Sequence, residues 1–259
     1  MKYLAETCLL THGLRSIDEA ALQSAWPFPE ARLAWVDRGE LKTGTLQEYL
    51  PFRLRRSEYG RIDCDTLEKA LQSGMSGALT ASGTMAACRL LGVPLAVTCG
   101  MGGIGDIVGE ELCPDLPALA RIPVALIATA PKDMLDIPAT FRWLREHGVH
   151  VAGPECTGYI FESAHYLPEE SPEAYMTEEA IRRGAEAGGL LLLNPIPAEQ
   201  RIRDRGILES AVRYGKEKEK EGLIFHPAVN GEIDRLTDGY SSRLQLLSFI
   251  ENIPLAMAM

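Results

Sequence analysis

The chain alternates short apolar runs with amphipathic segments over most of its length. Four apolar runs have the length of buried strands: 93–100, 123–129, 149–154 and 189–197. Segments with apolar positions at helical spacing lie around and between them: 65–74, 83–92, 116–122, 136–148 and 177–188. Strands that are apolar on both faces, separated by helices, are typical of parallel sheets covered on both sides. The pattern predicts an α/β fold with three layers, α/β/α.

The N-terminal region adds an antiparallel element. Residues 31–37, "ARLAWVD", and 40–44, "ELKTG", predict two strands joined by a tight turn at Arg38-Gly39. A hairpin next to parallel strands predicts a mixed central sheet. No internal repeat or low-complexity linker divides the chain, so we expect residues 1–259 to form a single domain.

The composition excludes several classes of function. The formal net charge is -10 and no tract is rich in Lys and Arg, so nucleic acid is an unsuitable partner. No apolar run approaches the length of about 20 residues that a membrane span needs. The start, "MKYLAETCLLTHGL", is too polar for a signal peptide. We therefore expect a cytoplasmic protein with a small-molecule partner and no membrane association.

The cysteines do not indicate a metal centre. None forms a CxxC pair or has zinc-ligand spacing: Cys8, Cys64, Cys88, Cys99, Cys113 and Cys156. We expect reduced thiols that behave as small buried hydrophobes, with a catalytic cysteine as the alternative.

Three of the predicted strands end in chemically active segments. The strand 93–100 runs into the glycine loop "GMGGIGD", 123–129 runs into Lys132, and 189–197 ends in polar Asn194 and two prolines. Ligands of α/β sheets bind at the carboxyl ends of the strands. The topology therefore predicts a site that contains these three segments.

The glycine loop fits more than one role. Its GxGGxG spacing resembles a dinucleotide-binding fingerprint, but the residues that follow, "IVGEELCPDL", are a poor helix start. A loop whose backbone approaches a small ligand and a purely structural turn both suit the glycines. We favour the loop that approaches a ligand.

Lys132 has a structural and a functional interpretation. As a surface lysine it would pack its stem on the sheet. In a low-dielectric site its ammonium form is disfavoured, and the neutral amine could attack a carbonyl or an anomeric carbon to give an imine. The residues alone leave both interpretations open.

The acidic candidates are ambiguous in the same way. Glu6 alone would be an exposed acid, and Asp115 is typical of the N-cap of the helix that follows it. Glu110 and Glu111 are loop acids or part of a hard-cation site. Asn194, before a proline, could simply end a strand.

Taken together, these segments resemble one protein family. The order "LAETCLLTHGL", "SGALTASGTMAACRLLGVPLAVTCGMGGIG", "CPDLPALARIPVALIATAPKDMLDIPATFRWLREHGVHVAGP", "GLLLLNPIP" is similar to that of the pseudouridine-5'-phosphate glycosidases, also called indigoidine synthase A-like proteins. The resemblance covers about residues 1–200 and, more weakly, the tail "GEIDRLTDGYSSRLQLLSFIEN". The chain is shorter than typical members, and we treat it as a divergent one.

The resemblance implies a glycosidase or carbon–carbon lyase of nucleoside metabolism. The family reversibly splits pseudouridine 5'-phosphate into uracil and ribose 5-phosphate, through a lysine that opens the sugar to a Schiff base. Lys132 in "KDMLD" matches that lysine, and Glu6 in "AETCLLTHG" matches the glutamate that transfers protons. Members are trimeric α/β/α proteins that bind a divalent metal, typically manganese.

The resemblance also implies binding residues. Glu111 takes the place of the aspartate that holds the metal. The positions that match substrate contacts are Thr80, Ala81, Cys113, Asp115 and Asn194.

The phosphate end departs from the family pattern. Gly105 and Asp106 replace a His-Arg pair after the glycine loop, Cys113 replaces a serine, and Arg61 stands for a lysine that helps to hold the substrate. A carboxylate in place of a cation disfavours a phosphate dianion. A guanidinium at Arg61 compensates in part, because it binds phosphate well.

Three functions fit these residues. Our first hypothesis is a Schiff-base glycosidase or lyase whose substrate differs at the phosphate end, such as another C-nucleoside or a modified sugar. The second is the family reaction itself, with Arg61 and backbone amides holding the phosphate. The third is a non-catalytic ligand-binding or regulatory homologue that kept the scaffold of the site.

Overall fold

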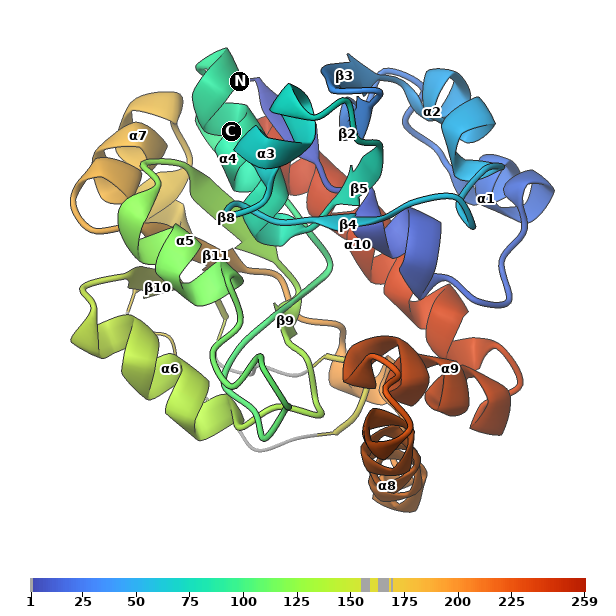
Figure 1. The fold of residues 1–259 in the computed structure, drawn as a ribbon. Helices are drawn as coiled ribbons and strands as arrows, with labels where there is room; N and C mark the ends of the chain where they lie inside the picture. Colours follow the sequence, from blue (N-terminus) through green and yellow to red (C-terminus); the bar gives the residue numbers. More distant parts are fainter. Residues whose placement is uncertain (1, 155–158, 163–167, 169) are drawn as a thin grey trace.

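The computed structural model describes residues 2–154, 159–162, 168 and 170–259 (Figure 1). Cys156, predicted to be a buried thiol, lies outside these ranges. The strands of the main sheet are β1 (Tyr3–Ala5), β2 (Leu33–Asp37), β3 (Glu40–Gly44), β4 (Gly60–Ile62), β5 (Gly77–Leu79), β6 (Leu95–Val97), β8 (Ala125–Ala128), β10 (His150–Ala152) and β11 (Leu190–Leu193). They are ordered β10-β11-β8-β6-β1-β2-β5-β4, with β3 on β2.

The sheet is mixed, as predicted. β1, β6, β8, β11 and β10 pair in parallel, whereas β2 runs antiparallel to both β3 and β5. The predicted hairpin turn is present at Arg38 and Gly39, whose φ angles are 52° and 77°. Positive φ at both central residues matches the twist of a two-residue hairpin, and the glycine meets this need without a Cβ clash.

Helices cover both faces of the sheet, which confirms the three-layer architecture (Figure 1). One face carries α3 (Leu67–Gln72), α4 (Ala81–Leu91), α5 (Asp115–Arg121) and α6 (Ile137–Glu146), and the other carries α7 (Glu178–Glu186) and α10 (Tyr240–Ala258). Along β6, Leu95 and Val97 pack toward the α10 side and Ala96 toward the α4 side. Buried strands with two covered faces explain the continuous apolar runs in the sequence.

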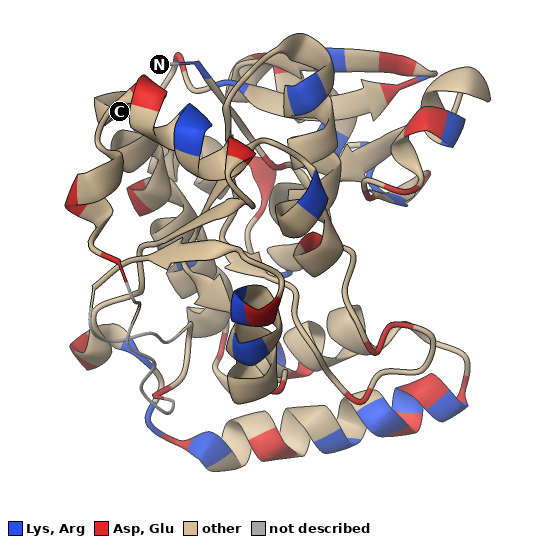
Figure 2. Ribbon diagram, turned by 90° about the vertical axis from the view of Figure 1, so that its left-hand side faces the viewer, with Lys and Arg blue, Asp and Glu red and all other residues tan. Residues whose placement is uncertain are grey.

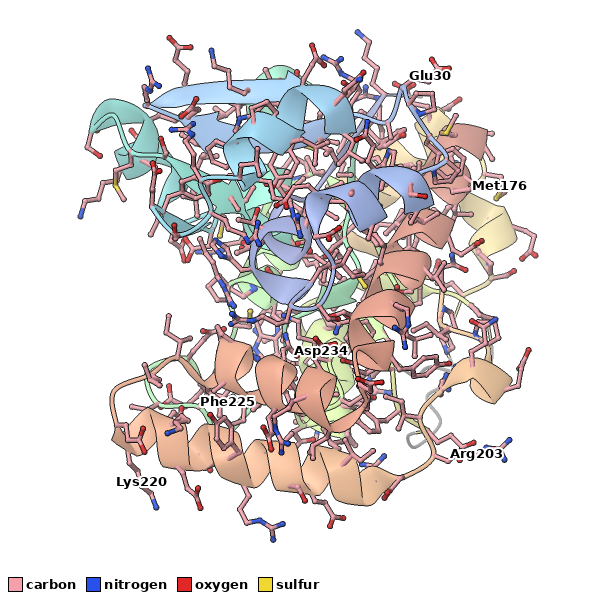
Figure 3. All side chains as sticks on the ribbon, turned by 90° about the vertical axis from the view of Figure 1, so that its right-hand side faces the viewer. Glu30, Met176, Arg203, Lys220, Phe225 and Asp234 are labelled. Atoms are coloured by element: carbon pink, nitrogen blue, oxygen red, sulfur yellow. The ribbon has the colours of Figure 1, made fainter. Side chains whose placement is uncertain are left out.

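The remaining elements lie at the edges of these layers. They are η1 (Leu9–Gly13), α1 (Glu19–Ala25), α2 (Leu46–Arg53), η2 (Pro172–Tyr175), η3 (Ala198–Gln200), α8 (Arg205–Lys220) and α9 (Phe225–Leu236), with a small sheet of β7 (Gly100–Met101) and β9 (Ala130–Pro131). The long helix α8 lies below α9 (Figure 3). Basic and acidic residues are interspersed along α8 (Figure 2), as expected for a solvated face. Within the described residues, every helix is too short or too polar to span a bilayer.

A buried arginine fixes the segment that follows β1. Arg53, at the end of α2, has no exposed surface and donates to the carbonyl oxygens of Leu10 and Ile17 at 2.6 Å each. Its third contact is the carboxylate of Glu19, also at 2.6 Å. The two carbonyl oxygens would be left buried without these donors if the guanidinium were removed. Arg53 therefore ties η1 and α1 to α2.

We predict that Arg53→Ala lowers the free energy of unfolding by about 3 kcal/mol, because it leaves the buried carbonyl oxygens of Leu10 and Ile17 without these hydrogen-bond donors. Arg56→Ala is the matched control: Arg56 also contacts Glu19, but 42% of its side chain is exposed. Its loss should cost no more than about 1 kcal/mol. Urea denaturation followed by circular dichroism measures both, and equal losses would contradict the role given to Arg53.

Candidate active site

A cavity of about 300 Å³ opens at the carboxyl ends of the strands. Both predicted catalytic residues, Glu6 and Lys132, line it. So do five of the predicted substrate-binding residues: Arg61, Thr80, Ala81, Cys113 and Asp115. The structure thus brings together residues from the first strand, the glycine-loop region and the centre of the chain.

Glu6 is placed by β1, a strand inside the main sheet. It directly follows β1, which lies between β6 and β2, and its amide donates to the carbonyl of Val97 at 2.9 Å. The residue is 6% exposed. Burial raises the pKa of Glu6 to about 7, although the positive charge of Lys132 partly opposes this effect. A carboxyl group of this kind can both give and take a proton near neutral pH.

Lys132 directly follows the short strand β9, which pairs with β7 before the glycine loop. Its amide donates to the carbonyl of Met101 at 3.1 Å, so the backbone position is fixed. Its side chain is half-buried and, in the described part of the chain, makes no hydrogen bond or ion pair. The amine therefore lines the cavity without a hydrogen bond or ion pair to a described residue.

The neighbouring Asp133 links the turn that carries Lys132 to segment 159–161. One carboxylate oxygen accepts from the amides of Ile160 at 3.0 Å and Phe161 at 3.3 Å, while the other has no partner among the described atoms. Burial raises the pKa of Asp133 to about 7. Two backbone bonds to one oxygen pin segment 159–161, including the cavity-lining Tyr159, against the turn that carries Lys132.

Asp115 joins two walls of the cavity. Its two carboxylate oxygens accept from the amides of Ser82 at 2.9 Å and Gly102 at 2.8 Å. The prediction that Asp115 is the N-cap of α5 was wrong: Pro114 occupies that position, and the Asp115 carboxylate binds other segments instead. At Gly102 a Cβ would lie 2.0 Å from the sulfur of Cys113, so only glycine allows this approach.

One wall of the cavity suits an anion. Thr80 caps α4 by accepting from the amide of Gly83 at 3.2 Å, and the first turn of the helix, with Ala81, faces the cavity. Helix N-termini carry partial positive charge. Arg61, from β4, adds a full positive charge to the same site.

Three predicted site residues lie elsewhere in the structure. The Asn194 amide donates to the side chain of Asn252 at 2.9 Å and lines a separate surface cavity. Gly105 donates its amide to the carbonyl of Glu111 at 3.1 Å and does not line the main cavity. Glu111 is exposed, and its neighbour Glu110 faces the cavity instead.

The donor set for a divalent metal is therefore incomplete. Among the described residues no group of three or more His, Cys, Asp and Glu side chains is arranged to hold a metal ion. Glu111 is exposed and does not line the cavity, and both oxygens of Asp115 already accept backbone hydrogen bonds. Manganese binding through Glu111 therefore stays a prediction, and we derive no chemical step through a metal.

The sequence did not single out the residues that the C-terminal helices contribute. His226 and Asn230 come from α9, and Gln245 comes from α10. All three lie in the weakly similar tail or just before it, with no motif to mark them. Their only signal is that polar residues occur at positions that the helix periodicity would bury.

Comparisons with known proteins place the chain among relatives of similar length. The family described as indigoidine synthase A like protein matches residues 31–259. A pseudouridine-5'-phosphate glycosidase from Mesorhizobium japonicum is 31% identical over 269 residues, covering 95% of this chain and 87% of the relative. One from Caldanaerobacter subterraneus is 30% identical over 264 residues, covering 93% and 84%.

Two solved structures share the fold. An indigoidine synthase A-like protein from Thermotoga maritima superposes with a TM-score of 0.77 at 21% identity, covering 98% of this chain and 90% of the other. The prealnumycin C-glycosynthase, solved with ribulose 5-phosphate, also gives a TM-score of 0.77 at 21% identity, covering 99% and 90%.

We predict that Asp115→Asn lowers the free energy of unfolding by about 2 kcal/mol, because an amide cannot accept at both atoms and leaves one buried N–H unpaired. Glu111→Gln, in the loop just before α5, is the control, since its side chain is exposed, and it should change stability by less than about 0.5 kcal/mol. Thermal and urea unfolding measure both variants. A fully stable Asp115→Asn protein would show that the two backbone bonds are dispensable.

Proposed function

The chain belongs to the indigoidine synthase A-like family, and we propose that it is a C-glycosidase that cleaves the carbon–carbon glycosidic bond of pseudouridine 5'-phosphate. The observation that carries the proposal is the meeting of Glu6 and Lys132 in one cavity, where the lysine charge acts on a buried carboxyl group. The activity of the curated relatives supports it. We propose residues 1–259 as one catalytic domain.

A C-nucleoside has no glycosidic oxygen that an acid could protonate, so cleavage needs an electron source at the anomeric carbon. In the proposed reaction, the neutral Nζ of Lys132 attacks this carbon, the ring C–O bond breaks, and Glu6 gives its proton to the departing oxygen. The nitrogen lone pair then forms a C=N bond while the bond to the base breaks. Glu6, now a carboxylate, takes a proton from the attached nitrogen and gives it to the base carbon. Water then hydrolyses the imine, which releases ribose 5-phosphate and restores the free amine of Lys132.

The proposed substrate carries its phosphate at the Arg61 wall. Arg61 supplies a positive charge, and the N-terminal turn of α4 supplies partial positive charge beside it. Asp106, the carboxylate that the sequence suggested would repel a phosphate, does not line the cavity, and its backbone and side chain contact Lys216 of α8. This arrangement favours the phosphorylated substrate over an altered, unphosphorylated one. The manganese requirement and the homotrimer stay predictions.

We expect borohydride to trap one ribose 5-phosphate adduct on Lys132, because only an imine is reduced to a stable amine. Lys132→Ala and Lys132→Arg should both lose the adduct and lower kcat by about 10³-fold or more. The arginine variant keeps the positive charge, so it separates nucleophilic from electrostatic roles. Intact-protein and peptide mass spectrometry identify the adduct. An adduct retained in either variant would exclude Lys132 as the nucleophile.

We also expect the ratio of the wild-type kcat/KM to that of Glu6→Gln to fall as pH rises through about 7, the pKa to which burial raises Glu6. The ratio isolates the acid, because both proteins need the neutral amine of Lys132, which becomes more abundant as pH rises. The protonated carboxyl group donates to the ring oxygen, and a group with a raised pKa loses its proton only above that pH. A ratio that does not depend on pH would contradict the assignment of Glu6 as the acid.

A further inference from the structure

Helix α9 contributes a polar wall to the cavity that the proposed chemistry does not use. His226 and Asn230 lie one helical turn apart and both line the cavity. They are 2% and 8% exposed, so neither side chain is solvated at the surface.

Asn230 has no structural task that explains its burial. Within the described chain its side-chain amide makes no hydrogen bond, although the residue is more than nine-tenths buried. Because the residue lines the cavity, this amide is open to the ligand space rather than to another part of the protein. An amide that lines a cavity and lacks a protein partner is suited to pair with a ligand.

His226 is held in place beside Asn230. Its Nε2 lies 3.6 Å from a carboxylate oxygen of Glu110, and its Nδ1 lies 3.2 Å from the sulfur of Met134. The loop with Glu110 is itself anchored, because the amide of Val108 donates to Glu219 of α8 at 2.9 Å. The imidazole and the carboxylate therefore face the cavity from fixed positions.

The charges of the two walls differ. Arg61 and the N-terminus of α4 favour an anion, whereas the Glu110 carboxylate disfavours one near α9. An elongated ligand with one anionic and one uncharged end would place the uncharged end against α9. An asparagine amide offers one donor and one acceptor side by side, which matches the N–H/C=O edge of a lactam.

We propose that Asn230 recognises the N–H/C=O edge of the pyrimidine base, beside the His226–Glu110 pair, and that it fixes the direction in which the nucleotide enters the cavity. This inference rests on the proposed function, since it names the base-binding part of the same site. It assigns a substrate-binding role to one residue of α9 and leaves the proposed bond-breaking residues unchanged.

The test distinguishes binding of the base from binding of the sugar phosphate. In the unreactive Lys132→Ala background, with manganese chloride present, isothermal titration calorimetry measures the Kd of pseudouridine 5'-phosphate and of ribose 5-phosphate, which lacks the base. Adding Asn230→Leu, which is close in size but cannot pair, should weaken pseudouridine 5'-phosphate about tenfold or more. It should leave ribose 5-phosphate unchanged.

Two further variants complete the design. Arg61→Ala should weaken both ligands, because both carry the phosphate. Arg235→Gln, on the outer side of α9 with 67% of its side chain exposed, should weaken neither. Circular dichroism confirms that each variant is folded.

Equal weakening of both ligands by Asn230→Leu, or no effect on either, would overturn the inference, as would binding of neither ligand to the Lys132→Ala protein. Failure of the proposed function is seen separately, as the absence of a trapped adduct and of uracil release in the wild type. A protein that binds the base through Asn230 without turning it over would keep the inference and reject the enzyme.

Discussion

The carboxylate of Asp115 is the interaction on which the cavity depends. It accepts backbone N–H groups from the start of α4 and from the glycine loop, two segments that no sheet pairing joins. Hydrogen bonds to a charged group contribute about 1.5–3 kcal/mol each, more than a neutral pair. Because Asp115 is also the first residue of α5, one side chain sets the relative positions of three elements around the ligand space.

The burial of the residues around the cavity also changes the protonation of Glu6. Glu6 is buried beneath the ligand space, and its carboxyl group holds its proton near neutral pH although a lysine stands close by. Lys132 keeps its side chain free of protein partners in the described chain. Burial therefore raises the pKa of Glu6 so that its carboxyl group can act as an acid near neutral pH. The Lys132 amine lines the cavity, where a ligand can reach it.

The C-terminal helices complete a site that the sheet begins. Helix α8 holds the tip of the glycine loop through Glu219 and Lys216, and α9 packs on α8 and faces the cavity. The loop after Gly105 is thus stabilised by hydrogen bonds to residues of α8, which is distant in the sequence. A divergent loop can stay ordered in this way even though it lacks the His-Arg pair of the family pattern.

The sequence by itself determined the layers of the fold and led to the hypothesis that Lys132 and Glu6 react with the substrate. Apolar runs at strand length and helical spacing predicted β6, β8, β10 and β11 with their covering helices, because periodicity reports burial directly. Lys132 follows from its place after a strand, and its pairing with Glu6 follows from the family resemblance. Only the tertiary structure showed where the side chains of the loops lie. Glu110 rather than Glu111 faces the cavity, Asn194 pairs with Asn252, and Asp115 bridges segments instead of capping α5. Irregular segments have no period, so the direction of each side chain there is set by hydrogen bonds to residues far away in the sequence.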